Sequence, residues 1–329
     1  MILAGDIGGT KTLLALFKVN DNDLREVKSK RYVSKNFNSL ISILNDFLKN
    51  EKDVPRCAAF GIPGPVVNRR AKSTNLPWIV EEENLIEKSK IPKVKIVNDL
   101  AATAYAIPFL KPEELITIKK GSAEHFSERY AVVAPGTGLG QAFMLCEGNK
   151  RIVIPSEGGH SDFAPSNKIE TELFLYLKKK YDHVSYERII SGSGMPNIFD
   201  FLIEIHHLKP TEITLEKMKT EDKAKVISDM ALKKRDEVCE KALDIFVSVL
   251  GAYAGNFVLT TMATGGIYLG GGIPIKILPK LKDGTFVKSF SNKGRLNKLV
   301  GATPIFLINN NKAALTGAAR IAFEIENNK

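Results

Sequence analysis

Three glycine-rich turns carry the residue types that bind phosphate groups. They are Asp6-Ile7-Gly8-Gly9-Thr10-Lys11, Pro135-Gly136-Thr137-Gly138 and Leu269-Gly270-Gly271-Gly272, and each adjoins a short apolar run. Glycines let backbone N–H groups approach an anion closely, because no Cβ intervenes. Threonine hydroxyls in the first two turns add donors, and Lys11 adds a positive charge. Any one of these turns also fits an ordinary hairpin, but the set of three favours phosphate binding.

Asp6 is a carboxylate within the first of these turns. A lone carboxylate beside negatively charged phosphates is expected to hold Mg²⁺, directly or through water. In an ordinary turn, Asp6 would instead be a capping residue. Two other phosphate-binding folds are disfavoured. The chain has no Gly-Lys pair for a Walker A motif, and no G-x-G-x-x-G opens a helix for a dinucleotide site.

Carboxylates at three further places could bind or activate a polar ligand. Asn98-Asp99 ends the apolar run 94–97, where ligands bind in α/β sheets, although a helix N-cap is the alternative. Glu157 and His160 share one turn without a third ligand at helical spacing. This disfavours zinc, so hydrogen bonds to a polyhydroxyl ligand fit better. Glu187 alone is ambiguous, since Arg188 offers it a surface partner.

Apolar patterning predicts which elements position these residues. Breaks at 8–9 and 20–23 predict an antiparallel strand meander at the start of the chain, and crossover helices then alternate with buried strands. The first half has expected strands at 2–7, 12–19, 24–33, 56–62 and 94–97 and helices at 38–50, 80–89 and 101–108. Beyond it we expect strands at 114–118, 130–134, 141–146, 151–155, 267–269 and 304–308 and helices at 168–181, 194–206, 235–262 and 311–325.

The stretch 245–275 has no charged residue and contains the G-x-x-x-G pair Gly251 and Gly255. Its length alone permits a membrane span, but seven glycines and several polar residues disfavour one. We predict a buried helix to about Met262 whose small residues let another backbone approach, followed by a turn and a strand. No membrane association is therefore expected.

Composition excludes several classes of protein. The 329 residues are 44% apolar and 26% charged, which is typical of a folded soluble protein with two lobes and not of a disordered or disulfide-stapled chain. The net charge of +10 is dispersed along the chain, so we expect solvated helix faces and no nucleic acid partner. Three cysteines without a C-x-x-C pair, and a start without signal-peptide features, indicate reduced thiols in the cytoplasm.

Taken together, these segments resemble the bacterial-type ATP-dependent glucokinases of the hexokinase, actin and heat-shock-ATPase superfamily. The three glycine turns are similar to the two phosphate segments and the adenosine segment of that family. The sugar segments match 96–99, the run 157–165, the run 183–192 and Ser73-Thr74-Asn75-Leu76-Pro77-Trp78. The resemblance extends from residue 1 to about 320, with the motifs in family order.

The resemblance implies an α/β fold of two ribonuclease-H-like lobes around a central cleft. The small lobe would comprise 1–108 and 309–329, and the large lobe 109–308. The implied reaction is ATP-dependent phosphoryl transfer to the 6-hydroxyl of glucose, with Mg²⁺ as cofactor and a homodimer as the assembly. Asp99 would be the general base. The implied sugar ligands are Asn75, Asn98, Asp99, Glu157, His160 and Glu187. The implied nucleotide and metal residues are Asp6, Gly8, Gly9, Thr10, Lys11, Gly136, Thr137, Gly138, Gly270, Gly271 and Gly272.

Two departures from the family pattern stand out. The cysteine-rich zinc loop and the N-terminal DNA-binding helices of repressor-type relatives are missing, and Lys11 replaces the Asn of many glucokinases. Lys11 could add charge near the phosphates or point outward. The alternative function is a kinase for another hexose or amino sugar. A non-enzymatic ATPase or regulator is disfavoured, because the chain has no room for a peptide-binding domain.

Overall fold

The computed structural model describes residues 1–20, 23–51, 53–72, 76–122, 127–148 and 150–327. The chain forms two compact units, Met1–Glu114 with Ala142–Pro155 and Asn310–Lys329, and Leu115–Gln141 with Ser156–Asn309. The sequence assigned 142–155 to the large lobe, whereas the contacts place this segment in the first unit. Arg151 explains the difference, since its Nη1 donates to Glu324 Oε1 at 3.1 Å and its guanidinium lies 4.8 Å from the Phe109 ring centre.

The first unit is built on a five-stranded sheet in the order β3-β2-β1-β4-β8. Strands β1, β2 and β3 pair antiparallel, so the predicted meander is confirmed, and β4 and β8 continue the sheet parallel to β1. The strands are β1 (Ile2–Ile7), β2 (Lys11–Asn20), β3 (Asp23–Val33), β4 (Cys57–Ile62) and β8 (Lys93–Asn98). The carboxyl ends of β1, β4 and β8 therefore lie at one edge of this sheet.

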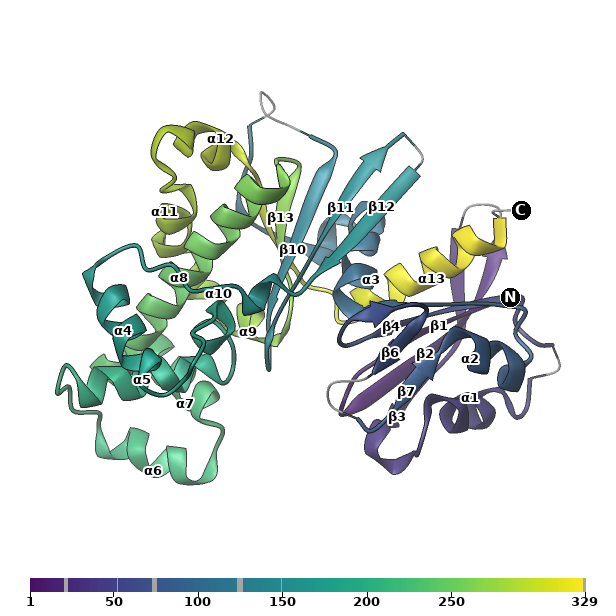
Figure 1. Ribbon diagram of the computed structural model, residues 1–329, viewed down its shortest axis with the longest axis horizontal. Coiled ribbons are helices and arrows are strands. Elements are labelled where there is room, and N and C mark those ends of the chain that lie inside the picture. Colours follow the sequence, from purple (N-terminus) through teal and green to yellow (C-terminus); the bar gives the residue numbers. More distant parts are fainter. Residues whose placement is uncertain (21–22, 52, 73–75, 123–126, 149, 328–329) are drawn as a thin grey trace. The chain divides into compact units, whose positions relative to one another are not determined.

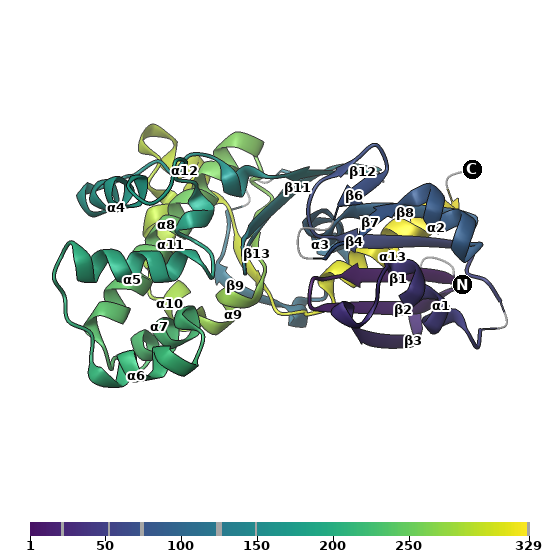
Figure 2. The ribbon, with the colours of Figure 1, turned by 60° about the horizontal axis from the view of Figure 1, so that its bottom comes forward.

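Helices cover both faces of this sheet (Figure 1, Figure 2). Residues alternate between the faces along β1: Ile2 and Ala4 pack with α13, and Leu3 packs with α1 and α2. Helix α1 begins after Ser39, whose side chain forms a capping box with Ser42. The helices are α1 (Leu40–Leu48), α2 (Glu82–Ser89), α3 (Asp99–Ala106) and α13 (Ala313–Asn327).

A three-stranded sheet in the order β5-β6-β7 was not predicted. Its strands are β5 (Val66–Val67), β6 (Arg70–Lys72) and β7 (Ile79–Glu81). Strands of two or three residues are too short to show a hydrophobic period, so the sequence contains no signal for them. Short 3₁₀ turns at Ser34–Asn36, Ile107–Phe109 and Pro112–Glu114 complete this part of the chain.

The second sheet has six strands in the order β12-β11-β10-β13-β14-β9. Strand β13 runs parallel to β10 and to β14, and β9 pairs antiparallel with β14. All six strands were predicted to within about two residues. They are β9 (Leu115–Lys119), β10 (Arg129–Pro135), β11 (Leu139–Glu147), β12 (Lys150–Ser156), β13 (Gly266–Leu269) and β14 (Ile305–Ile308).

The second unit contains β9, β10, β13 and β14 of this sheet, and the rest of it is mostly helical (Figure 1). The predicted helices are confirmed as α4 (Lys168–Lys178), α5 (Gly194–Glu204) and α8 (Glu237–Thr261). The prediction missed α6 (Glu212–Thr220), α7 (Lys223–Leu232), α9 (Gly272–Lys276), α10 (Leu278–Leu281), α11 (Thr285–Ser291) and α12 (Asn297–Ala302). Most of these are short, and lysine-rich α6 buries only Thr214, so it shows no apolar stripe.

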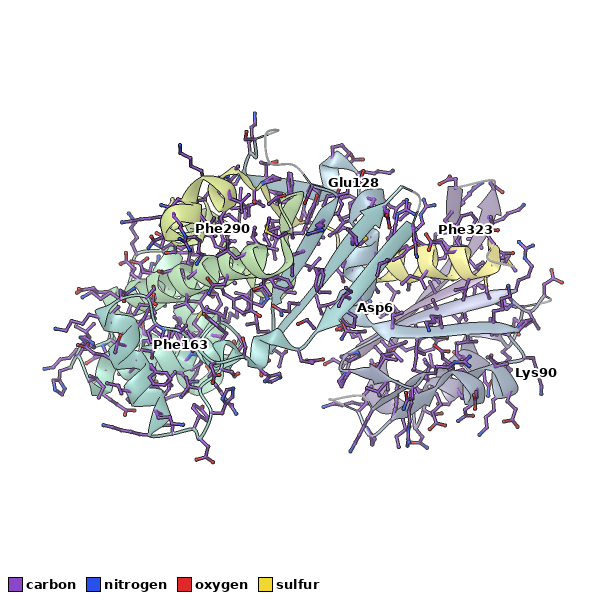
Figure 3. The ribbon with its side chains drawn as sticks, turned by 45° about the horizontal axis from the view of Figure 1, so that its top comes forward. Asp6, Lys90, Glu128, Phe163, Phe290 and Phe323 are labelled. Carbon is purple, nitrogen blue, oxygen red and sulfur yellow. The ribbon has the colours of Figure 1, made fainter. Side chains whose placement is uncertain are left out.

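Helix α8 is the core helix of the second unit and the one described helix that is long and apolar enough to pass a membrane-span test. Its most apolar window is 72% buried inside the protein, which confirms the prediction of a buried helix. A Cβ at Gly251 would lie 2.3 Å from Phe286 O, and one at Gly255 would lie 2.3 Å from Phe290 O. Helix α11, labelled at Phe290 in Figure 3, therefore packs directly on the α8 backbone.

Candidate active site

The sheet of the first unit brings Asp6 and Asp99 together. Asp6 is the last-but-one residue of β1, and its neighbour in β4 is Gly61. Asp99 follows β8, the strand on the other side of β4. A Cβ at Gly61 would lie only 3.4 Å from the Asp99 Cα, so the β4 backbone passes close to the backbone of Asp99. Two acids that are far apart in sequence thus lie at the same sheet edge, as parallel strands predict.

Burial and the Asp99 charge raise the pKa of the Asp6 carboxyl to about 6, burial being the larger cause. Figure 3 labels Asp6 in the first unit. Both causes disfavour a negative charge at this position. A cation placed beside Asp6 would remove the penalty, so the environment suits a metal ligand better than an ordinary turn residue.

We expect Asp6→Asn to change how stability depends on pH. The folded-state pKa of about 6 lies above the usual 3.8, so wild type loses on the order of 3 kcal/mol of stability as pH rises from about 4 to above 6. Asparagine does not ionise and escapes that loss. Urea unfolding without ligands, at pH 4.5 and 7.5, should show the variant gaining stability relative to wild type at the higher pH. An equal difference at both values would contradict the raised pKa.

Asn98 is the N-cap of α3, and Asp99 is its first residue. The Asn98 Oδ1 accepts the N–H groups of Leu100 at 2.9 Å and Ala101 at 3.1 Å, while its amide donates to Gly64 O at 3.2 Å. The N-cap alternative is therefore correct for Asn98, and one amide hydrogen is left for a ligand. Leu100 N also donates to Asp99 Oδ1 at 2.9 Å, which orients that carboxylate.

The first glycine turn is closed by Gly8 N, which donates to Lys11 O at 2.9 Å. A Cβ at Gly8 would lie 2.8 Å from that same oxygen, so a glycine is required here. Thr10 and Lys11 are exposed, with Lys11 opening β2. Buried Ser34 supports the turn, because its hydroxyl donates to Gly8 O at 2.7 Å. Ser34 lies in a different turn and belongs to no motif, so sequence analysis did not identify it.

The other two glycine turns lie side by side in the second unit. Strands β10 and β13 are parallel neighbours, so 136–138 and 270–272 follow them at one sheet edge. Gly271 has a φ of +80°, and its Cβ would lie 2.5 Å from Pro135 O, so both conformation and space require glycine. Gly136 N donates to Gly138 O at 2.8 Å, and Thr137 is exposed.

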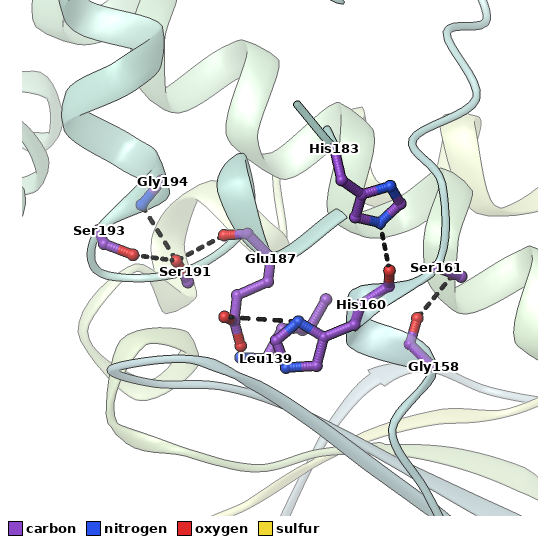
Figure 4. A network of polar contacts seen from close by, with 9 residues as sticks. All are labelled: Leu139, Gly158, His160, Ser161, His183, Glu187, Ser191, Ser193 and Gly194. Carbon is purple, nitrogen blue, oxygen red and sulfur yellow. Dashed lines mark hydrogen bonds and ion pairs between the residues drawn. The ribbon is translucent and has the colours of Figure 1, made fainter. Parts of the chain in front are cut away.

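Glu187 and His160 lie beside Leu139, the residue that follows the turn 136–138 (Figure 4). Leu139 N donates to Glu187 Oε2 at 2.8 Å, and His160 Nδ1 lies 3.9 Å from Glu187 Oε1. His183 Nε2 donates to His160 O at 2.7 Å and so braces that segment. Arg188 was the alternative, a surface partner for Glu187. Arg188 instead lies over the Tyr181 ring, 4.2 Å from its centre.

A cavity of about 370 Å³ in the second unit is lined by His160, Glu187, His183 and Arg188 among others. Glu157, at the N-cap of the short helix Gly158–His160, is exposed. Gln141 was not predicted as a site residue, yet it supports this segment. Its amide donates to Ser156 Oγ at 2.7 Å, and it accepts from the buried Tyr253 hydroxyl.

Asn75 lies outside the described residues. Of the predicted site residues that are described, the first unit brings together Asp6, Gly8, Gly9, Thr10, Lys11, Asn98 and Asp99. The second unit brings together the two other glycine turns with Glu157, His160 and Glu187. Among the described residues no group of three or more His, Cys, Asp or Glu could hold a metal by itself. A site for Mg²⁺ would need phosphate oxygens and water besides Asp6.

Known proteins resemble this chain over its whole length. A family model described as glucokinase matches residues 3–325. The glucokinase of Nostoc sp. strain PCC 7120 is 40% identical, and the alignment covers 98% of each chain. The crystal structure of a glucokinase from an Antarctic psychrotroph superposes with a TM-score of 0.86 at 30% identity, covering 98% of each chain.

A more distant structure has the same fold. It is a ROK family glucokinase from Streptomyces griseus in complex with glucose and AMPPNP, with a TM-score of 0.64 at 18% identity, covering 98% of this chain and 99% of that one. Both structural matches confirm the predicted actin-like ATPase fold class with its two mixed sheets. The chain thus belongs to the glucokinase family, and it is an enzyme that phosphorylates glucose with ATP.

Proposed function

We propose that Asp99 is the general base that takes the proton of the glucose 6-hydroxyl. Its position after β8 and its orientation by Leu100 N support this role. A 6-hydroxyl is a poor nucleophile at neutral pH, so an aligned carboxylate contributes about 10²–10⁴-fold to the rate. The 6-hydroxyl oxygen, as it loses its proton to Asp99, attacks the γ-phosphorus of ATP. The bond between the γ-phosphorus and the oxygen that bridges it to the β-phosphate breaks, and ADP leaves.

The sugar hydroxyls would be held by Asn98, Glu157, His160 and Glu187, together with Asp99 itself and Asn75. Carboxylates suit this task because each oxygen accepts a hydrogen bond from a sugar hydroxyl. Each such charge-assisted hydrogen bond stabilises the complex by about 1.5–3 kcal/mol. Asn98 would act through its remaining amide hydrogen, since its oxygen already caps α3. A sugar in which one hydroxyl is missing or has the opposite configuration leaves a carboxylate without its partner, and this discriminates against deoxy sugars and epimers.

The nucleotide would bind to the three glycine turns. In the first unit we assign Gly8, Gly9, Thr10 and Lys11 to the phosphates, where exposed Lys11 and Thr10 can supply charge and a hydroxyl. In the second unit we assign Gly136, Thr137 and Gly138 to phosphates and Gly270, Gly271 and Gly272 to the adenosine. A Cβ at Gly136 or Gly272 would have no atom within 4 Å, so both backbones are open to a ligand.

Asp6 would hold Mg²⁺, directly or through water. The raised pKa of Asp6 supports this assignment, because a nearby cation offsets the cost of its charge. When bound, Mg²⁺ neutralises charge on the transferring phosphoryl group. The protein's part is to keep one ionised carboxylate at a fixed place, on the buried strand β1.

We expect Asp6→Asn to raise the Mg²⁺ concentration for half-maximal activity, because the amide is a weaker metal ligand without charge. A second readout is Mn²⁺ affinity of the ADP complex by electron paramagnetic resonance, which should weaken about tenfold. Asp53→Asn removes an exposed acid elsewhere in the first unit and serves as the control. An unchanged metal requirement in Asp6→Asn would count against the metal role of Asp6.

The observation that carries this proposal is the pair of carboxylates at one edge of the first sheet, close enough for Asp99 to raise the Asp6 pKa. A coupled assay with glucose, mannose, fructose, galactose and N-acetylated amino sugars tests the substrate. Glucose should have the highest kcat/KM, and the product should carry phosphate on O6. If another hexose or an amino sugar ranks first, the alternative kinase is correct.

We also propose that the protein is a cytoplasmic homodimer, and that each chain has the two lobes expected from the sequence apart from the segment 142–155. The free, largely buried cysteines Cys57 and Cys239 are consistent with a reducing compartment. Sedimentation velocity of the purified protein tests the dimer, and a species with the mass of one chain at micromolar concentration would reject it.

A further inference from the structure

The Glu187 carboxylate fills the space beside the phosphate turn 136–138. Its Oε2 accepts the Leu139 N–H at 2.8 Å, which fixes the residue that follows the turn. A Cβ at Gly138 would lie 2.5 Å from that same oxygen, so any side chain at 138 would displace the carboxylate. Figure 4 shows the Glu187 carboxylate beside Leu139 and His160.

Both segments that we assign to the sugar rest on this turn or on the residues after it. Gly192, five residues beyond Glu187, donates its N–H to Gly136 O at 2.8 Å. In the segment 157–160, a Cβ at Gly159 would lie 2.1 Å from Leu139 O. The backbone of 136–139 is therefore held between two sugar segments, and at Gly159 there is no space for a side chain.

We propose that Glu187 couples sugar binding to nucleotide binding inside the second unit. It is a sugar ligand and also a positioning residue for the phosphate turn, through its bond to Leu139 N. This inference rests on the proposed function, which assigns Glu187 to the sugar and 136–138 to the phosphates. A glucose hydroxyl on the carboxylate and the phosphates on the turn would then each favour the other.

The capacity of a carboxylate allows both tasks at once. Its two oxygens offer about four acceptor sites, so one bond to Leu139 N leaves others for sugar hydroxyls. The side chain is 25% exposed, which permits contact with a ligand. Bound sugar restrains the Glu187 carboxylate, and the carboxylate in turn restrains the Leu139 N–H. The turn is then already partly ordered when the nucleotide binds, so nucleotide binding costs less conformational entropy. Linkage requires the nucleotide to strengthen sugar binding by the same factor.

The first test is Gly138→Ala against Gly301→Ala, with glucose affinity measured by calorimetry without nucleotide. Gly138 has no left-handed φ, and the atom in the way is the flexible end of Glu187, so the variant can fold by moving that carboxylate. We expect its glucose Kd to rise about tenfold or more, as for loss of one charge-assisted hydrogen bond.

Gly301→Ala is the matched control, because Gly301 lies in α12 outside the assigned site and a Cβ there would have Ser291 Oγ as its nearest neighbour at 3.7 Å, an ordinary contact. Its glucose Kd without nucleotide should stay within about twofold of wild type. An unchanged glucose Kd in Gly138→Ala, or an equal rise in both variants, would overturn the coupling.

The second test measures AMPPNP affinity without sugar in Glu187→Ala and Glu187→Gln. Alanine removes the acceptor for Leu139 N, so the AMPPNP Kd should rise about fivefold or more. Glutamine keeps an oxygen for that N–H and should restore AMPPNP affinity while still weakening glucose binding. A residue that only contacts sugar would leave AMPPNP binding unchanged in both variants, and that result rejects the positioning role even if Gly138→Ala does not fold.

Measurements on the wild-type protein distinguish failure of the proposed function from failure of the coupling through Glu187. If it neither binds nor phosphorylates glucose, the proposed function itself fails. If it does both, and glucose and AMPPNP affinities stay independent in wild type and in the variants, only the coupling through Glu187 fails. Circular dichroism melting curves for each variant confirm that a changed affinity reflects a folded protein.

Discussion

Asp99→Asn should lower kcat at least 10²-fold while glucose affinity stays within about tenfold of wild type. Asparagine can still accept the Leu100 N–H through its side-chain oxygen, so the start of α3 keeps its geometry. It cannot accept the proton of the 6-hydroxyl. Steady-state kinetics with glucose and ATP, combined with a direct glucose titration, separate the two effects.

The pH profile of the same variant gives a second readout. Because the Asp99 charge raises the pKa of Asp6, Asp99→Asn should shift the acid-side loss of kcat to lower pH. The same exchange at exposed Asp53 is the control and should leave turnover unchanged. Near-normal kcat in Asp99→Asn would remove this residue from the mechanism.

Gly317→Ala should destabilise the first unit by about 3 kcal/mol, because overpacking a close backbone contact forces both elements to move. Gly317 lies in α13, and a Cβ there would lie 1.7 Å from Ala102 O in α3. An oxygen of the backbone cannot rotate away as a side chain can. Since α3 begins at Asp99, its displacement should also lower kcat. Thermal melting and the glucose assay together measure both effects.

Gly301→Ala in α12 is the control for this exchange. Its Cβ would have Ser291 Oγ as nearest neighbour at 3.7 Å, an ordinary contact. Alanine favours a helix by up to about 1 kcal/mol over glycine, so Gly301→Ala should be neutral or slightly stabilising. Equal melting temperatures for the two alanine variants would show that α13 can shift on α3 without cost.

Much of the fold follows from hydrophobic period and turn residues. The meander at 2–33 and the parallel strands β4 and β8 have clear apolar runs, so their order and the meeting of Asp6 with Asp99 were predictable. Helix α8 was predictable as a core helix, because its glycines mark a close backbone approach. The strands β5, β6 and β7 and the helices α9 to α12 are too short for a period to appear.

Supporting contacts of the site could not be predicted in the same way. Ser34 holds the Gly8 turn and Gln141 supports the segment after Ser156, yet both are polar residues with no motif of their own. Their partners lie 26 and 15 residues away in sequence. Only the three-dimensional arrangement of strands brings such side chains to their turns. For the same reason the sequence could not show that Glu187 contacts Leu139.

The apolar face that Ile2, Ala4, Ala15 and Ala59 present to α13 has a consequence for biosynthesis. The sheet strands β1 to β8 leave the ribosome early, but the helix that covers this face ends at Asn327. At about 5–20 residues per second, the nascent chain carries the uncovered face for tens of seconds. We therefore expect chaperones that bind apolar surface to engage the emerging chain, and truncations before α13 to aggregate.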